Sequence, residues 1–285
     1  MKWNVESAFE QRKRKLGVKE MNTDKNLDEQ IREEKERILR DVVELNSSEG
    51  VDGKISVRWK PRFSSDAFVS EGQKRLRPVD MQTYYDLQLS RGASHPIDNE
   101  LGWEFSSPEE GIKKRLGQNT ERFEHLKNNV EFKPEMHMLE IGTRDAQWLY
   151  YLAHQGFENT KGVDCVRMNV LWCQKNGFNV IEADAHQVAQ SFDHASFDFI
   201  FAYHVLEHCY DPALVFQQIF MLLKNDGVFH VEVPIEGYDP QRAHVYSFES
   251  GEIAAMLVKA GFSLIDTVAS VSMERVIARK TTLKK

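Results

Sequence analysis

The sequence predicts an α/β protein with a Rossmann-like, doubly wound sheet, preceded by an N-terminal extension of different character. From about residue 119 onward, short apolar segments alternate with helical segments, a pattern typical of parallel strands covered by helices. Gly156 and Gly177 follow two of the expected helices and suit helix C-termini, and Asp211-Pro212 can begin another helix. The chain therefore divides into an extension and an α/β domain.

The domain, residues 119–285, is expected to contain seven strands, of which the last two follow each other almost directly. The expected strands span residues 136–141, 160–165, 178–183, 197–203, 228–233, 263–269 and 271–279. Parallel neighbours need a crossover connection of a dozen or more residues. The last two strands must therefore pair antiparallel or occupy separate positions in the sheet.

Composition favours a protein of a reducing compartment. The chain has 285 residues, a net charge of −7 and three cysteines without CxxC spacing. We see neither a signal-peptide core nor a run approaching the roughly 18 apolar residues of a membrane span, so we expect a cytoplasmic protein without membrane contact. Residues 131–285 carry the whole excess of negative charge, which makes this half a poor surface for nucleic acid.

The extension, residues 1–118, begins with an amphipathic helix expected over about residues 26–46. Asn26 can cap the start of this helix. One helical stripe carries its apolar residues, Leu27, Ile31, Ile38, Val42 and Leu45. The stripe either packs on the chain's own domain or serves as a homodimer contact or a lid, and the pattern alone does not distinguish these roles.

A basic stretch follows at residues 54–77, where Lys and Arg side chains accompany Trp59 and Phe63. Basic grooves with aromatic residues bind single-stranded nucleic acid, so this stretch motivates an RNA-binding alternative. The simpler interpretation is a solvated hairpin and loop, because no signature of an RNA-binding module accompanies it.

The stretch MLEIGTRDAQWLYYLAHQG, from Met138 to Gly156, passes from an apolar strand through a turn into a helix. Dinucleotide sites at such turns follow the pattern G-x-G-x-x-G. Counted from Gly142, the second and third glycine positions hold Arg144 and Gln147. The turn therefore disfavours NAD or FAD.

Acidic side chains lie at the ends of three successive strands. Because carboxyl ends of parallel strands meet at one crevice, Glu140, Asp164 and Asp184 should converge there. Asp164 is placed to accept both ribose hydroxyls, and Asp184 to accept an adenine amino proton. Glu140 can serve the cationic amino end of an amino acid. This set fits an adenosyl group joined to a methionine.

The segments LEIGTRDA, GVD, EADA, FDFIFAYHVLEH and LKNDGVFHVEVP, in this order and spacing, resemble class I S-adenosylmethionine-dependent methyltransferases. They resemble the small-molecule branch, which carries LEH after the fourth strand. The resemblance covers about residues 119–280. It implies a seven-stranded sheet whose last strand is inserted antiparallel, agreeing with the short final connection.

The resemblance implies S-adenosylmethionine as the cofactor. The cofactor-binding residues it indicates are Glu140, Gly142, Thr143, Arg144, Asp164, Cys165, Asp184, Ala185 and Tyr203. The family's G-x-G-x-G turn becomes Gly142-x-Arg144-x-Ala146. Arg144 either points outward, pairs with the methionyl carboxylate or obstructs the site.

The segment HVLEH, residues 204–208, also matches the zinc motif H-x-x-E-H. That motif needs both imidazoles on one helical face and a third ligand. Asp211-Pro212 begins a new helix three residues after the segment, which leaves too little helix for the pair. We therefore expect no metal site.

Two histidines are candidate catalytic residues, because a hydroxyl acceptor needs a general base whose pKa lies near the working pH. His204 follows the fourth strand, beside the expected methyl group, and His244 lies in a connection that forms the acceptor wall in relatives. Either histidine could instead be structural, and an amine or stabilised carbanion needs no base.

These observations predict a methyltransferase for a small-molecule acceptor, such as a glycan, nucleotide-sugar or lipid-like metabolite. One alternative is an RNA methyltransferase that uses residues 54–77. Another, motivated by Arg144, is a non-catalytic Rossmann-like interaction module.

Overall fold

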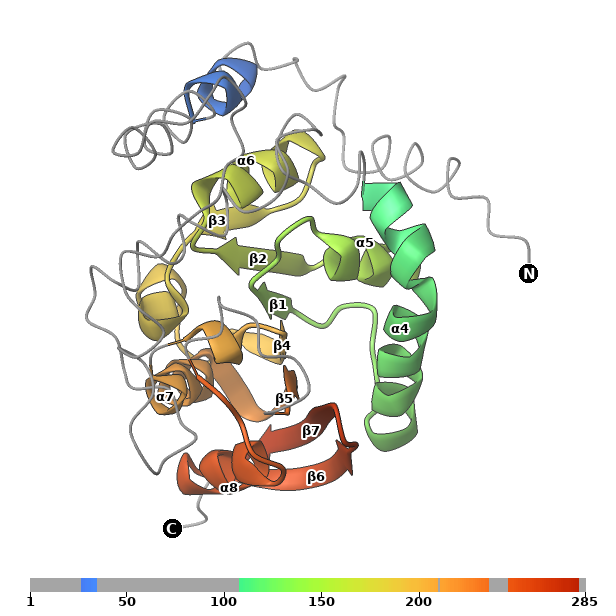
Figure 1. Cartoon of the computed structure of the whole chain (residues 1–285), viewed down its shortest axis with the longest axis vertical. Coiled ribbons are helices and arrows are strands. Elements are labelled where there is room, and N and C mark those ends of the chain that lie inside the picture. The colour runs from blue at the N-terminus through green and yellow to red at the C-terminus, as the bar shows by residue number, and fades with distance from the viewer. Residues whose placement is uncertain (1–26, 35–107, 210, 236–245, 282–285) are drawn as a thin grey trace, which may run out of the picture.

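The computed structural model of the chain describes residues 27–34, 108–209, 211–235 and 246–281. In these ranges seven strands form one sheet with helices on both faces (Figure 1). The strands are β1 (Met138–Ile141), β2 (Thr160–Asp164), β3 (Val180–Glu182), β4 (Phe197–Tyr203), β5 (Leu223–Pro234), β6 (Phe262–Ala269) and β7 (Met273–Lys280). All seven predicted strands are confirmed, although β5 begins ahead of the predicted residue 228.

The strand order is β3-β2-β1-β4-β5-β7-β6. Strands β1 to β5 pair in parallel, and β7 lies antiparallel between β5 and β6. The order reverses between β1 and β4, which is the point where doubly wound sheets bind ligands at their carboxyl edge. The predicted fold class, including the antiparallel last strand, is confirmed.

From residue 108 onward, five α-helices and two short 3-10 helices connect or precede these strands in the described ranges. They are α4 (Pro108–Asn129), α5 (Gln147–His154), α6 (Arg167–Lys175), α7 (Pro212–Leu222), α8 (Glu252–Lys259), η2 (Ala185–Ser191) and η3 (Leu206–His208). As predicted, Asp211 caps α7 by accepting a hydrogen bond from the N–H of Leu214 at 3.1 Å. In the described ranges, none of the helices is both long and apolar enough to span a membrane.

The two faces of the sheet bury different layers of side chains. Phe201 of β4 packs edge-on against Trp148 of α5, with ring centroids 5.4 Å apart, whereas Ile200 and Ala202 belong to the core on the opposite face with α7. Glu140 is in register with Phe201, and Glu232 of β5 is in register with Tyr203. Because side chains alternate along a strand, both glutamates face the same layer as α4 and α5.

Helix α4 begins at Pro108 and continues through residue 118, so the predicted domain boundary falls inside a continuous helix. Phe123 on α4 packs edge-on against Tyr151 of α5, with ring centroids 5.7 Å apart. His125, two residues further along α4, lies 2.9 Å from the carboxylate of Asp266 in β6. The helix therefore reaches from α5 to the far strand of the sheet (Figure 1).

Residues 27–34, the described part of the predicted 26–46 helix, are helical and lie beside α6 (Figure 1). Ile31 is buried with Met168 and Leu171 of α6. Asp28 forms an ion pair with Lys175 at 2.7 Å. This part of the stripe packs on the chain's own domain. The rest of the predicted helix and the basic stretch lie outside the described residues.

Candidate active site

The turn after β1 approaches its neighbours so closely that only glycine fits its first position. Gly142 has φ of 74°, and a Cβ atom there would collide with the side chain of Val205. Its N–H donates to the carbonyl of Val163 at 2.8 Å, which ties the turn to β2. The buried Thr143 makes a second such bond, at 3.2 Å.

The same turn keeps a left-handed backbone at two positions that are not glycine. Arg144 has φ of 47° and Ala146 has φ of 59°. Left-handed backbone costs an L-residue roughly 1–2 kcal/mol, so the surrounding contacts must hold this conformation in place. The chain thus retains a tight, glycine-like turn without the second and third glycines of G-x-G-x-G.

Asp164 supplies one of those contacts at the end of β2. Its buried carboxylate accepts hydrogen bonds from the N–H of Arg144 at 2.8 Å and of Val166 at 2.9 Å. Each carboxylate oxygen has two lone pairs and can therefore accept from more than one donor. Asp164 braces the turn, and its predicted role toward ribose hydroxyls remains a prediction.

Glu140 brings a second carboxylate to this edge and is 5% exposed. The N–H of Leu149 donates to this carboxylate, whereas Oε2 has no hydrogen-bond partner among the described residues. Burial, followed by the charge of Asp145, raises the pKa of Glu140 well above its ordinary value. A buried acceptor of this kind calls for a cationic or hydrogen-bonding partner.

Asp184 follows β3 and caps η2. Its carboxylate accepts from the N–H of His186 at 2.9 Å and lies 2.6 Å from Nδ1 of the same residue. His186 Nε2 accepts from the N–H of Asp211 at 3.2 Å, so its Nδ1–H donates to Asp184. Within the described part of the chain the other oxygen of Asp184, Oδ2, has no partner. Ala185 beside it is buried, and Cys165 beside Asp164 is partly exposed.

Tyr203 and His204 end β4, the strand next to β1. The Tyr203 hydroxyl lies 2.6 Å from Nδ1 of the buried His230, and the guanidinium of Arg122 lies 4.4 Å from the centre of the Tyr203 ring. Tyr203 thus faces the α4 layer. The predicted cofactor role of this residue remains a prediction.

His204 lies between two buried carboxylates. Its Nε2 is 3.0 Å from Glu232, and its Nδ1 is 3.5 Å from Glu207. Burial alone would lower the pKa of His204, but hydrogen bonds to Glu207 and Glu232 outweigh it and raise the pKa to about 9. The imidazole is therefore charged at neutral pH and has both nitrogens directed at carboxylates. In this arrangement it is not a free proton acceptor.

Glu232 is the centre of a buried ionic network that joins three elements. Arg275 of β7 donates to its carboxylate from Nε at 2.7 Å and from a terminal nitrogen at 2.6 Å. Arg122 of α4 donates to the same carboxylate from Nε at 3.3 Å and, at shorter range, from the terminal nitrogen Nη2. The network therefore fixes α4 and His204 relative to the same strand end.

A family model described as a methyltransferase domain matches residues 110–267, more than half of the chain. The chain belongs to this methyltransferase family. The cofactor of this methyltransferase is S-adenosylmethionine. The carboxylates of Glu140 and Asp164, both buried at adjacent strand ends, suit the cationic amino group and the hydroxyls of that molecule.

Solved structures share the fold of this methyltransferase. A proposed sarcosine dimethylglycine methyltransferase from Galdieria sulphuraria gives a TM-score of 0.50 at 13% identity, covering 58% of this chain and 86% of its own. A chain in the complex between the Haloferax volcanii Trm112 methyltransferase activator and its proposed methyltransferase gives a TM-score of 0.52 at 12% identity, covering 60% of this chain and 93% of its own. The [4+2]-cyclase SpnF gives a TM-score of 0.50 at 14% identity, covering 57% of this chain and 81% of its own. These identities establish a common fold only. No curated protein sequence matches the chain.

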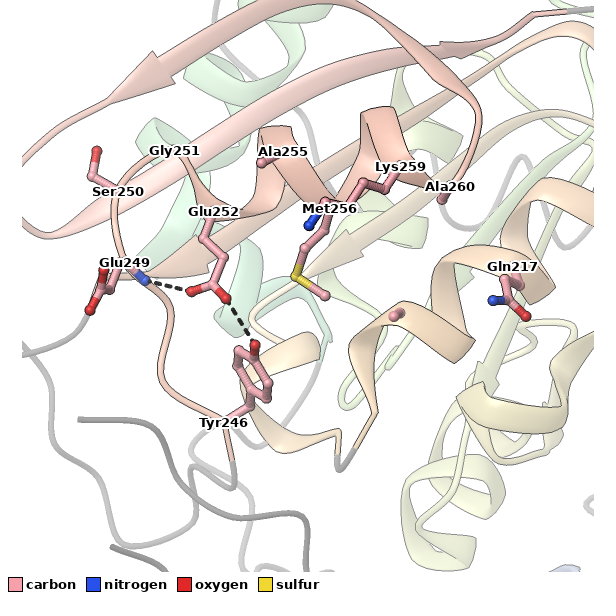
Figure 2. A pocket seen from close by; sticks show the side chains of 11 residues that line it. Gln217, Tyr246, Glu249, Ser250, Gly251, Glu252, Ala255, Met256, Lys259 and Ala260 are labelled. Atoms are coloured by element: carbon pink, nitrogen blue, oxygen red, sulfur yellow. Dashed lines mark hydrogen bonds between the residues drawn. The ribbon is translucent and has the colours of Figure 1, made fainter. Parts of the chain in front are cut away.

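The methyltransferase domain also has a hollow of about 570 Å³ between α7 and α8 (Figure 2). Tyr246 donates to Glu252 at 2.9 Å and the N–H of Glu249 donates to the same carboxylate at 3.1 Å, which fixes the segment before α8. None of the predicted cofactor residues lines this hollow. It is separate from the carboxylates of the strand ends.

Sequence reasoning placed the described cofactor residues at one sheet edge but overlooked the residues that support them. The structure adds Arg122, Asp145, Glu232 and Arg275. One available signal was the glutamate within the apolar strand VFHVEVP, because a charge in such a strand needs a buried partner. Of the segment HVLEH, only Leu206–His208 is helical, as the single turn η3, which is shorter than the helix of a zinc motif. His244 lies outside the described residues.

Proposed function

We propose that this methyltransferase acts on a small-molecule acceptor, with S-adenosylmethionine held at the carboxyl edge of β1, β2 and β3. The observation that carries the proposal is the pair of buried carboxylates, Glu140 and Asp164, on adjacent parallel strands. Glycan, nucleotide-sugar and lipid-like metabolites remain the candidate acceptors.

Each strand end has a distinct part in holding the cofactor. Asp164 would accept the ribose hydroxyls while its bonds to Arg144 and Val166 hold the turn. Glu140 would accept the cationic amino group, and Asp184, whose capping bonds fix its position, would accept the adenine amino group. Arg144 donates its backbone N–H to Asp164, which makes its backbone part of the proposed binding turn, and its side chain is partly exposed.

The bound cofactor supplies a methyl group on a cationic sulfur, so the chain's own residues mainly orient the acceptor and exclude water. His204 is our candidate on the acceptor side, as a fixed positive charge held by Glu207 and Glu232. A charge at this point would favour an acceptor atom that carries a lone pair or negative charge. His244 is the second candidate.

Calorimetric titration of S-adenosylmethionine and S-adenosylhomocysteine tests the cofactor site. We expect Asp164→Ala to weaken both ligands by about 1–3 kcal/mol, because ribose hydroxyls and backbone N–H groups would lose their acceptor. Asp164→Asn keeps one carbonyl oxygen as an acceptor, so its affinity for both ligands should lie between those of wild type and Asp164→Ala. The matched control is Asp193→Asn, an exposed acid of the same domain.

An unchanged affinity in Asp164→Ala would place the ribose elsewhere. Absence of heat for the wild-type protein at millimolar ligand would favour a non-catalytic interaction module. Mass spectrometry of the purified protein gives an independent check, since retained S-adenosylhomocysteine would identify an occupied site.

A further inference from the structure

Three carboxylates crowd the turn after β1, and all three are buried. Glu140, Asp145 and Asp164 are 5%, 5% and 6% exposed. Asp164 is satisfied by two backbone N–H groups, and Asp145 accepts from Nε2 of Gln147 at 2.5 Å. Glu140, by contrast, leaves Oε2 without a partner anywhere in the described ranges. Of the three, Glu140 has the least compensation for a negative charge.

The positive charges near Glu140 are engaged elsewhere. Arg122 is the cation that acts on Glu140, yet its guanidinium donates to Glu232 and to Asn119. Arg144 and Arg115 act on Asp145 instead. Little positive charge is therefore available to neutralise both Glu140 and Asp145. When two nearby carboxylates lack such compensation, one of them retains its proton.

The remaining groups that face Glu140 do not alter this balance. Asp164 adds another negative charge. Burial raises the pKa of the Tyr203 hydroxyl and of the Cys173 thiol well above their ordinary values, so both groups are neutral. Burial likewise raises the pKa of Asp145, in spite of its bond to Gln147.

We propose that Glu140 is protonated in the free protein and releases its proton when the amino group of S-adenosylmethionine binds. Asp145 is the positioning residue that sets how firmly Glu140 holds the proton. In this step the O–H bond of the Glu140 carboxyl breaks, the proton passes to the buffer, and the carboxylate pairs with the ligand's ammonium group. The inference rests on the assignment of Glu140 under the proposed function.

Proton release links cofactor affinity to pH. While Glu140 is protonated in the free protein, affinity should rise by up to about tenfold per pH unit, since one proton leaves for each ligand bound. Above the pKa of the free carboxyl, affinity should become independent of pH. The site would then hold its cofactor more weakly in acidified surroundings.

Titration calorimetry in buffers of different ionisation enthalpy, at the same pH, counts the protons released. We expect release of up to one proton for S-adenosylmethionine and for S-adenosylhomocysteine, which both carry the amino group. Methylthioadenosine, which has the adenosine portion without the amino acid, should bind without release. Release of a proton by methylthioadenosine would assign the proton to another carboxyl and overturn the inference.

Variants identify the carboxyl that releases the proton. Glu140→Gln should abolish release and weaken amino-acid-bearing ligands, and Asp145→Asn should reduce release at neutral pH because Glu140 then ionises more easily. The matched control is Glu135→Gln, which changes the same residue type at an exposed position before β1. This variant should release as many protons on ligand binding as wild type does. A difference infrared spectrum provides a second readout: the carboxylic acid band should disappear on binding in wild type.

The outcomes separate the inference from the proposed function. Measurable binding with the same heat in every buffer would overturn proton release and leave the cofactor site standing. Absence of binding in every buffer would overturn the proposed function itself. Undiminished release in Glu140→Gln would also contradict the inference.

Discussion

At the scale of single residues, the active-site edge combines left-handed backbone with buried charge. Arg144, Ala146 and His204 all have positive φ although none is glycine. Each lies directly after a strand end or in the turn that follows it. Such conformations persist only where neighbouring contacts determine them, and they concentrate at functional sites. For His204 the contacts are the two carboxylates on either side of its ring.

The charge of His204 can be measured directly. We expect its imidazole to titrate with a midpoint of about 9 by NMR, and Glu207→Gln to lower this midpoint because one acceptor loses its charge. Since the folded pKa is raised, this ion pairing should stabilise the fold fully below about pH 6.5 and be lost as pH rises through about 9. Glu131→Gln, an exposed acid, should leave the midpoint unchanged. A wild-type midpoint near 6.5 would restore His204 as a free base.

At the scale of elements, α4 is the helix that connects the two halves of the site layer. Arg122 binds Glu232 at the end of β5, and its guanidinium lies over the ring of Tyr203 in β4. Phe123, the next residue, packs edge-on against Tyr151 of α5. The polar sequence of α4 gave little sign of this position, because one buried arginine among many exposed charges has no distinctive spacing. Strands were easier to predict, since their apolar runs are bounded by turns.

Arg122→Ala should lower the free energy of unfolding by about 3–5 kcal/mol, because loss of one partner leaves a buried charge poorly compensated. Arg275 still binds Glu232, so a value at the lower end is expected. The control on the same helix is Lys127→Ala, whose exposed pair with Glu124 at 2.7 Å should contribute about 1 kcal/mol or less. Urea denaturation measures both. Similar small losses in the two variants would contradict the anchoring role of Arg122.

At the scale of the whole molecule, the sequence predicts architecture better than chemistry. Seven strands follow from local periodicity, whereas the antiparallel insertion of the last strand is implied by the methyltransferase resemblance and agrees with the one short connection. The strand-end carboxylates follow from the rule that parallel strands bind ligands at their carboxyl edge. The partners of Glu232 could not be predicted, because they depend on tertiary packing of α4 and β7 against β5, with Arg122 lying 110 residues and Arg275 lying 43 residues away in the sequence.

The docking of residues 27–34 on α6 is also a property of the whole molecule. Ile31→Ser should loosen this helix, since burial of an isoleucine side chain contributes about 1.5–3 kcal/mol. Hydrogen exchange should then accelerate at least about tenfold for amides of residues 27–34. Glu33→Ala, at an exposed position of the same helix, is the control. Unchanged exchange in Ile31→Ser would mean that the polar contacts of Asp28 and Gln30 suffice.

The placement of β7 has a consequence for synthesis on the ribosome. β5 emerges well before β7, yet β7 covers its free edge and brings Arg275 to Glu232. Before β7 has been synthesised, the nascent chain therefore exposes the unpaired edge of β5 and leaves Glu232 without its partner Arg275. Such intermediates are prone to pair with other chains. Chaperone demand during translation should consequently peak between the appearance of these two strands.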